Sequence, residues 1–145
     1  MKLLFVAAEG APFSKTGGLG DVIGALPKSL AKSGHDVRVI LPYYDMVEAK
    51  FGDQIEDILH FETKVGWRSQ YVGIMEMKYD GIQYYFIDNE YYFAGEKPYG
   101  YIHEDVEKFA FFSKAALSIL PVVGYQPDIV HCHDWQTGLV PVYLK

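Results

Sequence analysis

The stretch Lys15–Val22 reads KTGGLGDV and decides the fold of this chain. It follows the apolar run LLFVAA at residues 3–8, and it opens a segment whose apolar residues recur at helical spacing. A glycine-rich turn between a buried strand and a helix lets backbone N–H groups approach an anion, and the helix N-terminus adds about half a positive charge. Because Lys15 brings a full positive charge, the turn is predicted to bind the anionic part of a substrate.

That prediction competes with a plainer interpretation, because the turn matches neither common phosphate motif. A P-loop has its lysine after the glycines, whereas Lys15 precedes them. The dinucleotide fingerprint G-x-G-x-x-G needs a third glycine where Ile23 stands, and the second strand ends without a carboxylate until Asp45. The alternative to phosphate or nucleotide-sugar binding is therefore a simple tight turn between strand and helix.

The residues around the turn predict a strand–helix–strand unit. Continuous apolar sequence at residues 2–8 is typical of a parallel strand buried on both faces. In the helix that follows, we expect a kink at Pro27 and an end at Gly34. A second strand is expected at residues 36–41, and this order implies a right-handed crossover in a parallel sheet. The apolar side of the helix consists of Val22, Ile23, Leu26 and Leu30.

An antiparallel pair is predicted beside this unit. Residues 70–78 and 82–87 are rich in β-branched and aromatic types, and Tyr79-Asp80-Gly81 between them has hairpin chemistry. Residues 91–101 are then expected to form a loop. The fold class is therefore α/β, a Rossmann-like parallel sheet with flanking helices and an added β-hairpin.

The second half of the chain predicts a long helix and a last strand. Pro121 is expected to end the helix, and residues 129–133 to form the strand. An amphipathic helix is expected to begin at Trp135. The apolar face of the long helix consists of Val106, Phe109, Ala110, Phe112, Ala116, Leu117 and Leu120.

The length, composition and charge of the chain limit the classes of protein to which it can belong. With 145 residues, 50% of them hydrophobic, the chain is predicted to form one folded domain. A formal net charge of -6 argues against nucleic acid or an anionic membrane as the main partner. No apolar run approaches the ~20 residues that span a bilayer. The single cysteine, Cys132, fits a reducing compartment, so a cytoplasmic location is expected.

A second block, DIVHCHDWQTGL at residues 128–139, has the composition of a metal site but not its spacing. On a strand, His131 and His133 point to one face while Cys132 and Asp134 point to the other. Two histidines on one face can bind zinc, yet no third ligand stands at motif spacing. We therefore expect no metal.

The position of this block favours a sugar instead. Asp134 and Trp135 fall where the carboxyl end of a strand meets a helix, which is where open α/β sheets bind ligands. A carboxylate accepts hydrogen bonds from sugar hydroxyls, and an indole packs on the C–H face of the ring. The alternative for Trp135 is core packing, because tryptophan is mostly buried in proteins.

Together the two blocks resemble the signatures of bacterial glycogen synthases and plant starch synthases. KTGGLGDV continues with IGALP to Pro27, and the HCHDW block follows over a hundred residues later, in the order of the family. The connecting sequence is similar to the family throughout. The resemblance implies a two-domain GT-B fold, in which residues 1–145 form the N-terminal, acceptor-side domain, truncated before its end, and the nucleotide-binding domain is absent.

The resemblance also implies an activity, which is the retaining transfer of glucose from ADP-glucose to the nonreducing end of an α-1,4-glucan such as glycogen. ADP-glucose is then a substrate, and neither a cofactor nor a metal is expected. Because the rest of the active site belongs to the second domain, these 145 residues alone are expected to be inactive.

Site residues follow from the same resemblance. Lys15, Gly17 and Gly18 are expected to contact the phosphates of the donor. Asp21 belongs to the site in the family, although a helix N-cap is an alternative role. The residues expected to form a glucosyl or acceptor subsite are Asp134, also the candidate catalytic residue, Trp135, Gln136 and Thr137.

The resemblance also implies that the loop at residues 89–93 brings an aromatic ring to the cleft, with Tyr92 as the candidate and Tyr91 and Phe93 as alternatives. A hydrophobic rim over the core is the other interpretation of these rings. Glu9 and Asp45 each follow a predicted strand and also reach this region, without an assigned role. Two other functions stay open: a Rossmann-type oxidoreductase, which the missing third glycine disfavours, and a noncatalytic glucan-binding module.

Overall fold

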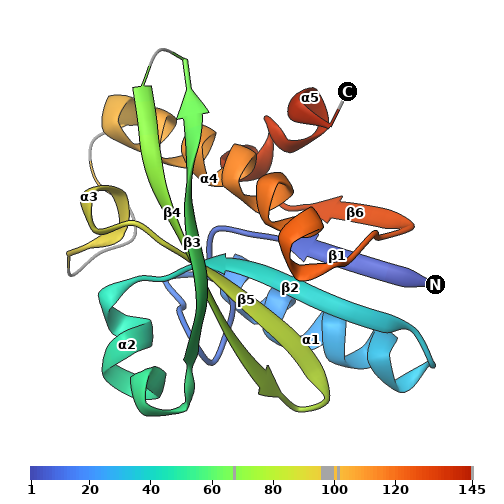
Figure 1. Ribbon diagram of the computed structural model, residues 1–145. Coiled ribbons are helices and arrows are strands. Elements are labelled where there is room, and N and C mark those ends of the chain that lie inside the picture. The colour runs from blue at the N-terminus through green and yellow to red at the C-terminus, as the bar shows by residue number, and fades with distance from the viewer. Residues whose placement is uncertain (67, 96–99, 101, 145) are drawn as a thin grey trace.

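Six strands form one sheet in the order β3-β4-β5-β2-β1-β6, and helices lie on both sides of it (Figure 1). The computed structural model describes residues 1–66, 68–95, 100 and 102–144. The strands are β1 (Lys2–Val6), β2 (Asp36–Pro42), β3 (Glu56–Val65), β4 (Arg68–Tyr79), β5 (Ile82–Asp88) and β6 (Ile129–Cys132). The helices are α1 (Gly18–Lys32), α2 (Asp45–Phe51), α3 (Glu90–Phe93), α4 (Ile102–Val123) and α5 (Val140–Tyr143), with 3-10 turns η1 (Gly52–Gln54) and η2 (Trp135–Thr137).

The sheet is mixed, which confirms the predicted class with its added hairpin. β1 pairs in parallel with β2 and β6, and β2 pairs in parallel with β5. β4 pairs antiparallel with both β3 and β5. At the β4–β5 turn, Asp80 and Gly81 have φ values of 50° and 78°, the conformation that a two-residue hairpin needs. Sequence analysis did not predict β3, most of whose residues are exposed, although Leu59, Phe61 and Val65 alternate with polar residues in its second half.

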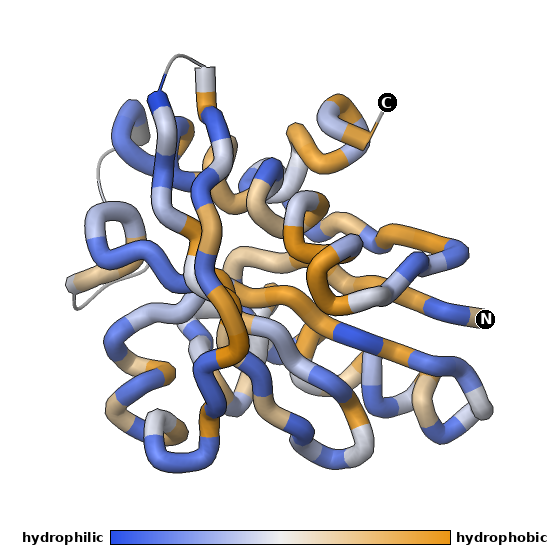
Figure 2. The backbone as a smooth tube through the Cα atoms, in the orientation of Figure 1, coloured by the Kyte–Doolittle hydropathy of each residue, from blue (hydrophilic) through white to orange (hydrophobic). Residues whose placement is uncertain are grey.

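The core lies along the central strands, where the hydrophobic segments gather (Figure 2). On one side of the sheet, Phe13 from the β1–α1 loop packs among four rings. Its ring centroid is 4.7 Å from that of Tyr84 and 4.8 Å from that of Phe51. The loop that leads into the glycine-rich turn is thereby anchored in the core. No helix in the described part of the chain is both long and apolar enough to cross a bilayer.

Helix α4 corrects two predictions. Pro121 does not end it, because proline removes only one backbone donor and its fixed φ is compatible with a last helical turn. The end comes at Gly124, whose φ is +68°, and Tyr125 N donates to Leu120 O at 3.1 Å, which is a Schellman cap. Val106, which was assigned to the apolar face, is exposed.

Two shorter segments also differ from the prediction. Part of the predicted loop at residues 91–101 is helix α3, which Asn89 begins by accepting a hydrogen bond from Tyr92 N at 3.2 Å. Residues 96–99 and 101 of that loop lie outside the described residues. The helix expected from Trp135 is divided into η2 and the single turn α5.

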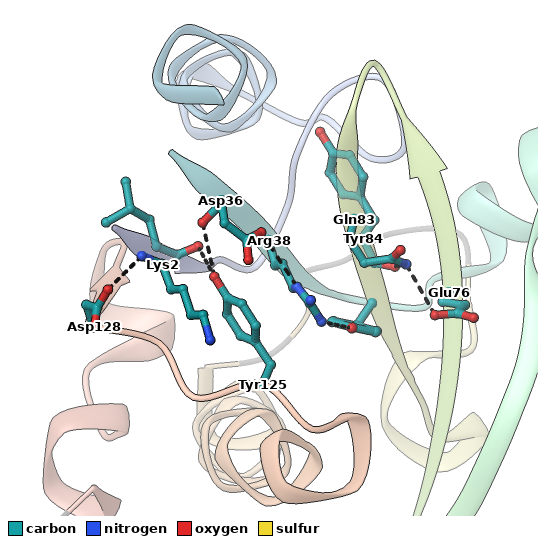
Figure 3. A network of polar contacts seen from close by, with 10 residues as sticks. Lys2, Asp36, Arg38, Glu76, Gln83, Tyr84, Tyr125 and Asp128 are labelled. Carbon is teal, nitrogen blue, oxygen red and sulfur yellow. Dashed lines mark hydrogen bonds and ion pairs between the residues drawn. The ribbon is translucent and has the colours of Figure 1, made fainter. Parts of the chain in front are cut away.

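A polar network ties the α4–β6 connection to the amino ends of β1 and β2 (Figure 3). Tyr125 Oη lies within hydrogen-bond distance of Leu3 O at 3.2 Å and Asp36 O at 3.1 Å. The guanidinium of Arg38 stacks on the Tyr125 ring, 4.0 Å from its centroid. Lys2 N donates to Asp128 Oδ2 at 2.7 Å, directly before β6. These contacts hold β6 in register beside β1, and so fix the place of the HCHDW block.

Replacing Gly10 by alanine is expected to lower the free energy of unfolding by about 1–3 kcal/mol through overpacking. A Cβ atom at position 10 would lie 2.6 Å from Ile23 Cγ2, in the buried face of α1. Gly18→Ala is the control, since a Cβ atom there has no neighbour within 4 Å and Gly18 is not the N-cap of α1. Urea unfolding followed by circular dichroism measures both variants, and equal free energies would contradict this account.

Candidate functional site

A cleft of about 340 Å³ opens beside the carboxyl ends of β1 and β6. It brings together the glycine-rich turn and the HCHDW block, two segments that are over a hundred residues apart in sequence. Parallel pairing of β1 with β6 causes this meeting, because both strands then end at the same edge of the sheet. The cleft is lined by Glu9, Thr16, Gly17, Gly18, Leu19, Asp105, Asp134, Trp135 and Gln136.

The turn is held by the carboxylate of Glu9, to which sequence analysis gave no role. Glu9 Oε2 accepts hydrogen bonds from Thr16 N and Thr16 Oγ1, each at 2.7 Å. Glu9 Oε1 accepts from Gly20 N at 3.2 Å, and Ala11 N donates to Gly20 O at 2.9 Å. A lone acidic residue between an apolar strand and a glycine-rich turn was the available sequence signal.

Gly17 and Gly18 face open space. A Cβ atom at either position would have no neighbour within 4 Å, and Gly17 is the N-cap of α1. Among the residues that the structure describes, no acceptor binds the N–H group of Gly17 or Gly18. These two donors therefore remain available to an anion at the helix N-terminus.

Lys15 and Asp21 form an ion pair across the turn, with Lys15 Nζ 2.9 Å from Asp21 Oδ1. Both side chains are about half exposed. The alternative role of Asp21 as N-cap is wrong, because α1 begins at Gly18 and Gly17 is its cap. The Lys15 stem lies across Gly20, where a Cβ atom would come within 2.9 Å of Lys15 Cγ. Contacts with Asp21 and Gly20 therefore fix the direction of the Lys15 side chain.

At the opposite wall, the backbone of Asp134 is strained. Its φ of +65° and ψ of −172° are unusual for a residue other than glycine, and its Oδ1 accepts from Trp135 N at 2.8 Å. The Trp135 ring meets Phe109 edge to face at 5.5 Å, yet 46% of Trp135 is exposed, so core packing is not its only role. Both residues line the cleft, as the block predicts.

The next two residues of the block differ from each other. Gln136 lines the cleft although it is only 7% exposed, and its backbone oxygen accepts from Ser113 Oγ at 3.3 Å. Thr137 is fully buried and is not part of the cleft lining. Its Oγ1 donates to His133 O at 2.9 Å, so Thr137 stabilises the bend after β6 rather than lining the site.

His131 in β6 and His133, one residue beyond its end, have their rings side by side, in line with the predicted alternation. Their ring centroids are 4.4 Å apart, and Phe5 packs against both rings. Burial and the neighbouring His131 lower the pKa of His133, which favours a neutral ring. Within the described ranges, no group of three or more metal-binding side chains occurs.

Tyr92 does not line this cleft. Its ring stacks on Phe111 with the centroids 4.8 Å apart, and it is 5% exposed. Burial raises the pKa of Tyr92 to about 12. The candidate aromatic residue of this segment is therefore a core residue, whereas the adjacent Tyr91 is exposed. The helical turn of α3, absent from the prediction, gives the two rings these opposite environments.

Asp105 at the start of α4 is a cleft residue that sequence analysis missed. It is buried, and its two carboxylate oxygens accept from Gly100 N at 3.2 and 3.1 Å. Lys108 Nζ lies 3.5 Å from the same carboxylate. Asp45, which follows β2, instead accepts from Gly95 N at 2.9 Å and does not line the cleft.

Comparison with known proteins assigns the chain to a family. A family model described as "Starch synthase catalytic domain" matches residues 2–145. The chain belongs to this family. Two proteins of Streptococcus pneumoniae named glycogen synthase, from strains Hungary19A-6 and CGSP14, are each 63% identical to it over 145 residues. The chain spans about 30% of the length of those curated relatives.

A solved structure agrees with this assignment. The catalytic domain of starch synthase IV from Arabidopsis thaliana, bound to ADP and acarbose, matches 99% of this chain with a TM-score of 0.85 and 36% identity. The match covers 30% of the plant chain. Family and fold class are therefore both confirmed.

Asp21→Asn is expected to tighten the binding of pyrophosphate about threefold, because Lys15 then loses its competing partner. The effect should shrink in high salt, since both side chains are exposed to solvent. Isothermal titration calorimetry at two ionic strengths measures the change, with the exposed Asp53→Asn as the matched control. Equal affinities in the two variants would show that the ion pair does not compete with the anion.

Proposed function

We propose that this chain forms the N-terminal, acceptor-side part of an ADP-glucose-dependent glycogen synthase, which transfers glucose to the nonreducing end of an α-1,4-glucan. The observation that carries the proposal is the single cleft in which the glycine-rich turn meets Asp134 and Trp135. Further support comes from relatives named glycogen synthase and from a structural neighbour bound to ADP and acarbose.

At one end of the cleft, the N–H groups of Gly17 and Gly18 bind the donor diphosphate, together with Lys15, which precedes the lining residue Thr16 but does not itself line the cleft. Negative charge grows on the leaving nucleotide as the glycosidic bond breaks, and preorganised donors stabilise that charge. In the ligand-free protein Asp21 pairs with Lys15. When the donor binds, this ion pair breaks and Asp21 contacts the substrate instead. This arrangement needs no metal and no cofactor, because cationic side chains and a helix N-terminus balance the phosphate charge.

At the other end, Asp134 and Trp135 contact the sugars. Asp134 Oδ1 is occupied by Trp135 N, which leaves Oδ2 able to accept from a sugar hydroxyl. Asp105 and Glu9 also line the cleft, but both carboxylates are engaged by protein donors. Asp134 is therefore the carboxylate that we propose for catalysis, with the exposed face of Trp135 packing on a glucosyl ring.

The remainder of the site comes from a second domain of a GT-B fold, which follows this sequence in the full-length cytoplasmic enzyme. That domain reads the nucleobase and supplies further cationic and acidic groups. These 145 residues alone are then expected to bind glucan without transferring glucose.

In the full-length protein, Lys15→Ala is expected to lower kcat/KM for ADP-glucose about 100-fold, because one preorganised positive charge is lost from the leaving group. The measurement is the transfer of labelled glucose from ADP-glucose, and in parallel from UDP-glucose, to glycogen. Lys50→Ala on α2 is the matched control, since Lys50 is exposed and is not among the residues that line the cleft. Asp134→Asn should lose activity without losing the fold.

Two outcomes would contradict the proposal. Absence of transfer by the full-length protein, with tight binding of maltooligosaccharide that Lys15→Ala leaves unchanged, would favour a noncatalytic glucan-binding module. Equal loss of activity in Lys15→Ala and Lys50→Ala would mean that the glycine-rich turn has no special part in the reaction.

A further inference from the structure

We propose that Glu9 is a positioning residue, which determines which N–H groups of the glycine-rich turn face the substrate. This inference rests on the proposed function for its kinetic part, and on the geometry of the turn for the rest. Glu9 is 2% exposed, although an ionised carboxylate is costly to bury without partners. All of its observed hydrogen bonds go to the turn and to the first residues of α1.

The donors that Glu9 takes lie on either side of the open pair. Thr16 precedes Gly17 and Gly18, and Gly20 follows them. The N-cap residue Gly17 has no side chain with which to cap α1, so the carboxylate caps the helix from eleven residues upstream. Glu9 fixes the flanking donors, and the residues between them, Gly17, Gly18 and Leu19, all line the cleft.

The negative charge of Glu9 and its positioning of the turn have opposite effects on donor binding, so an experiment can tell them apart. A carboxylate at the N-terminus of α1 repels the diphosphate that the same turn is proposed to bind. Glu9→Gln removes this repulsion, and it also places an amide NH₂ group against either Thr16 or Gly20. If Glu9 acted through charge alone, the substitution would tighten the binding of ADP-glucose. If Glu9 positions the turn, the substitution weakens it.

The test compares steady-state kinetics of the full-length protein with its Glu9→Gln variant. We expect the KM for ADP-glucose to rise about tenfold, as for the loss of a hydrogen bond to a charged group, while the KM for glycogen stays within about twofold. Glu56→Gln on β3 is the matched control, since it removes an exposed carboxylate away from the cleft. An unchanged or lower KM for ADP-glucose in folded Glu9→Gln would overturn the proposal.

A second pair of variants covers the case in which Glu9→Gln does not fold. Thr16 is exposed, so its substitutions are tolerated more easily than those at the buried Glu9. Thr16→Val removes one of the bonds to Glu9 and should raise the KM for ADP-glucose about threefold. Thr16→Ser keeps the hydroxyl and should resemble the wild type. Equal KM values for the valine and serine variants would count against the positioning role.

Amide hydrogen exchange of the ligand-free protein separates this inference from the proposed function. Exchange over residues 14–21 should be faster in Glu9→Gln than in wild type or Glu56→Gln, because two amide donors lose a charged acceptor. Absence of glucose transfer by the wild type would defeat the proposed function only. Equal exchange in the three proteins would defeat the positioning role, whatever the activity.

Discussion

The hydrogen bonds from the glycine-rich turn to the Glu9 carboxylate are the contact on which the cleft depends. They join the end of the first strand to the start of the first helix, with Thr16 and Gly20 as donors. Phe13, buried among aromatic rings, anchors the loop between them in the core. Burial of apolar side chains therefore holds the exposed N–H groups of the turn in fixed positions. Exposed N–H groups at a helix N-terminus are what binds an anion.

The two walls of the cleft hold their polar groups in different ways. On the turn side, Glu9 accepts three hydrogen bonds from protein donors, while Lys15 pairs with the exposed Asp21. On the β6 side, Asp134 has a strained backbone and leaves one carboxylate oxygen free of the contact with Trp135. Such strain persists only where the surroundings enforce it, and here Thr137 bonds the preceding His133 O while the buried Ser113 bonds Gln136 O on the other side of Asp134. A rigid site with a few available groups is the result.

Local sequence patterns predicted the elements whose signals are local. The β1–α1–β2 unit and the β4–β5 hairpin were predicted because burial and turn chemistry are encoded within a few residues. β3 was missed because it is an edge strand with mostly exposed residues, and the alternation of Leu59, Phe61 and Val65 with polar residues covers only its second half. The end of α4 was misplaced because the cap at Gly124 outweighs the proline three residues earlier.

For the site, the sequence by itself determined the chemistry of both walls, a lysine with glycines at one and a carboxylate with an indole at the other. It also determined the family, because both motifs occur in order. Only the tertiary structure decided that Glu9 and Asp105 line the same cleft, and that Tyr92 and Thr137 do not. The reason is physical: residue types and spacings are local, whereas burial and the pairing of β1 with β6 depend on contacts between segments over a hundred residues apart.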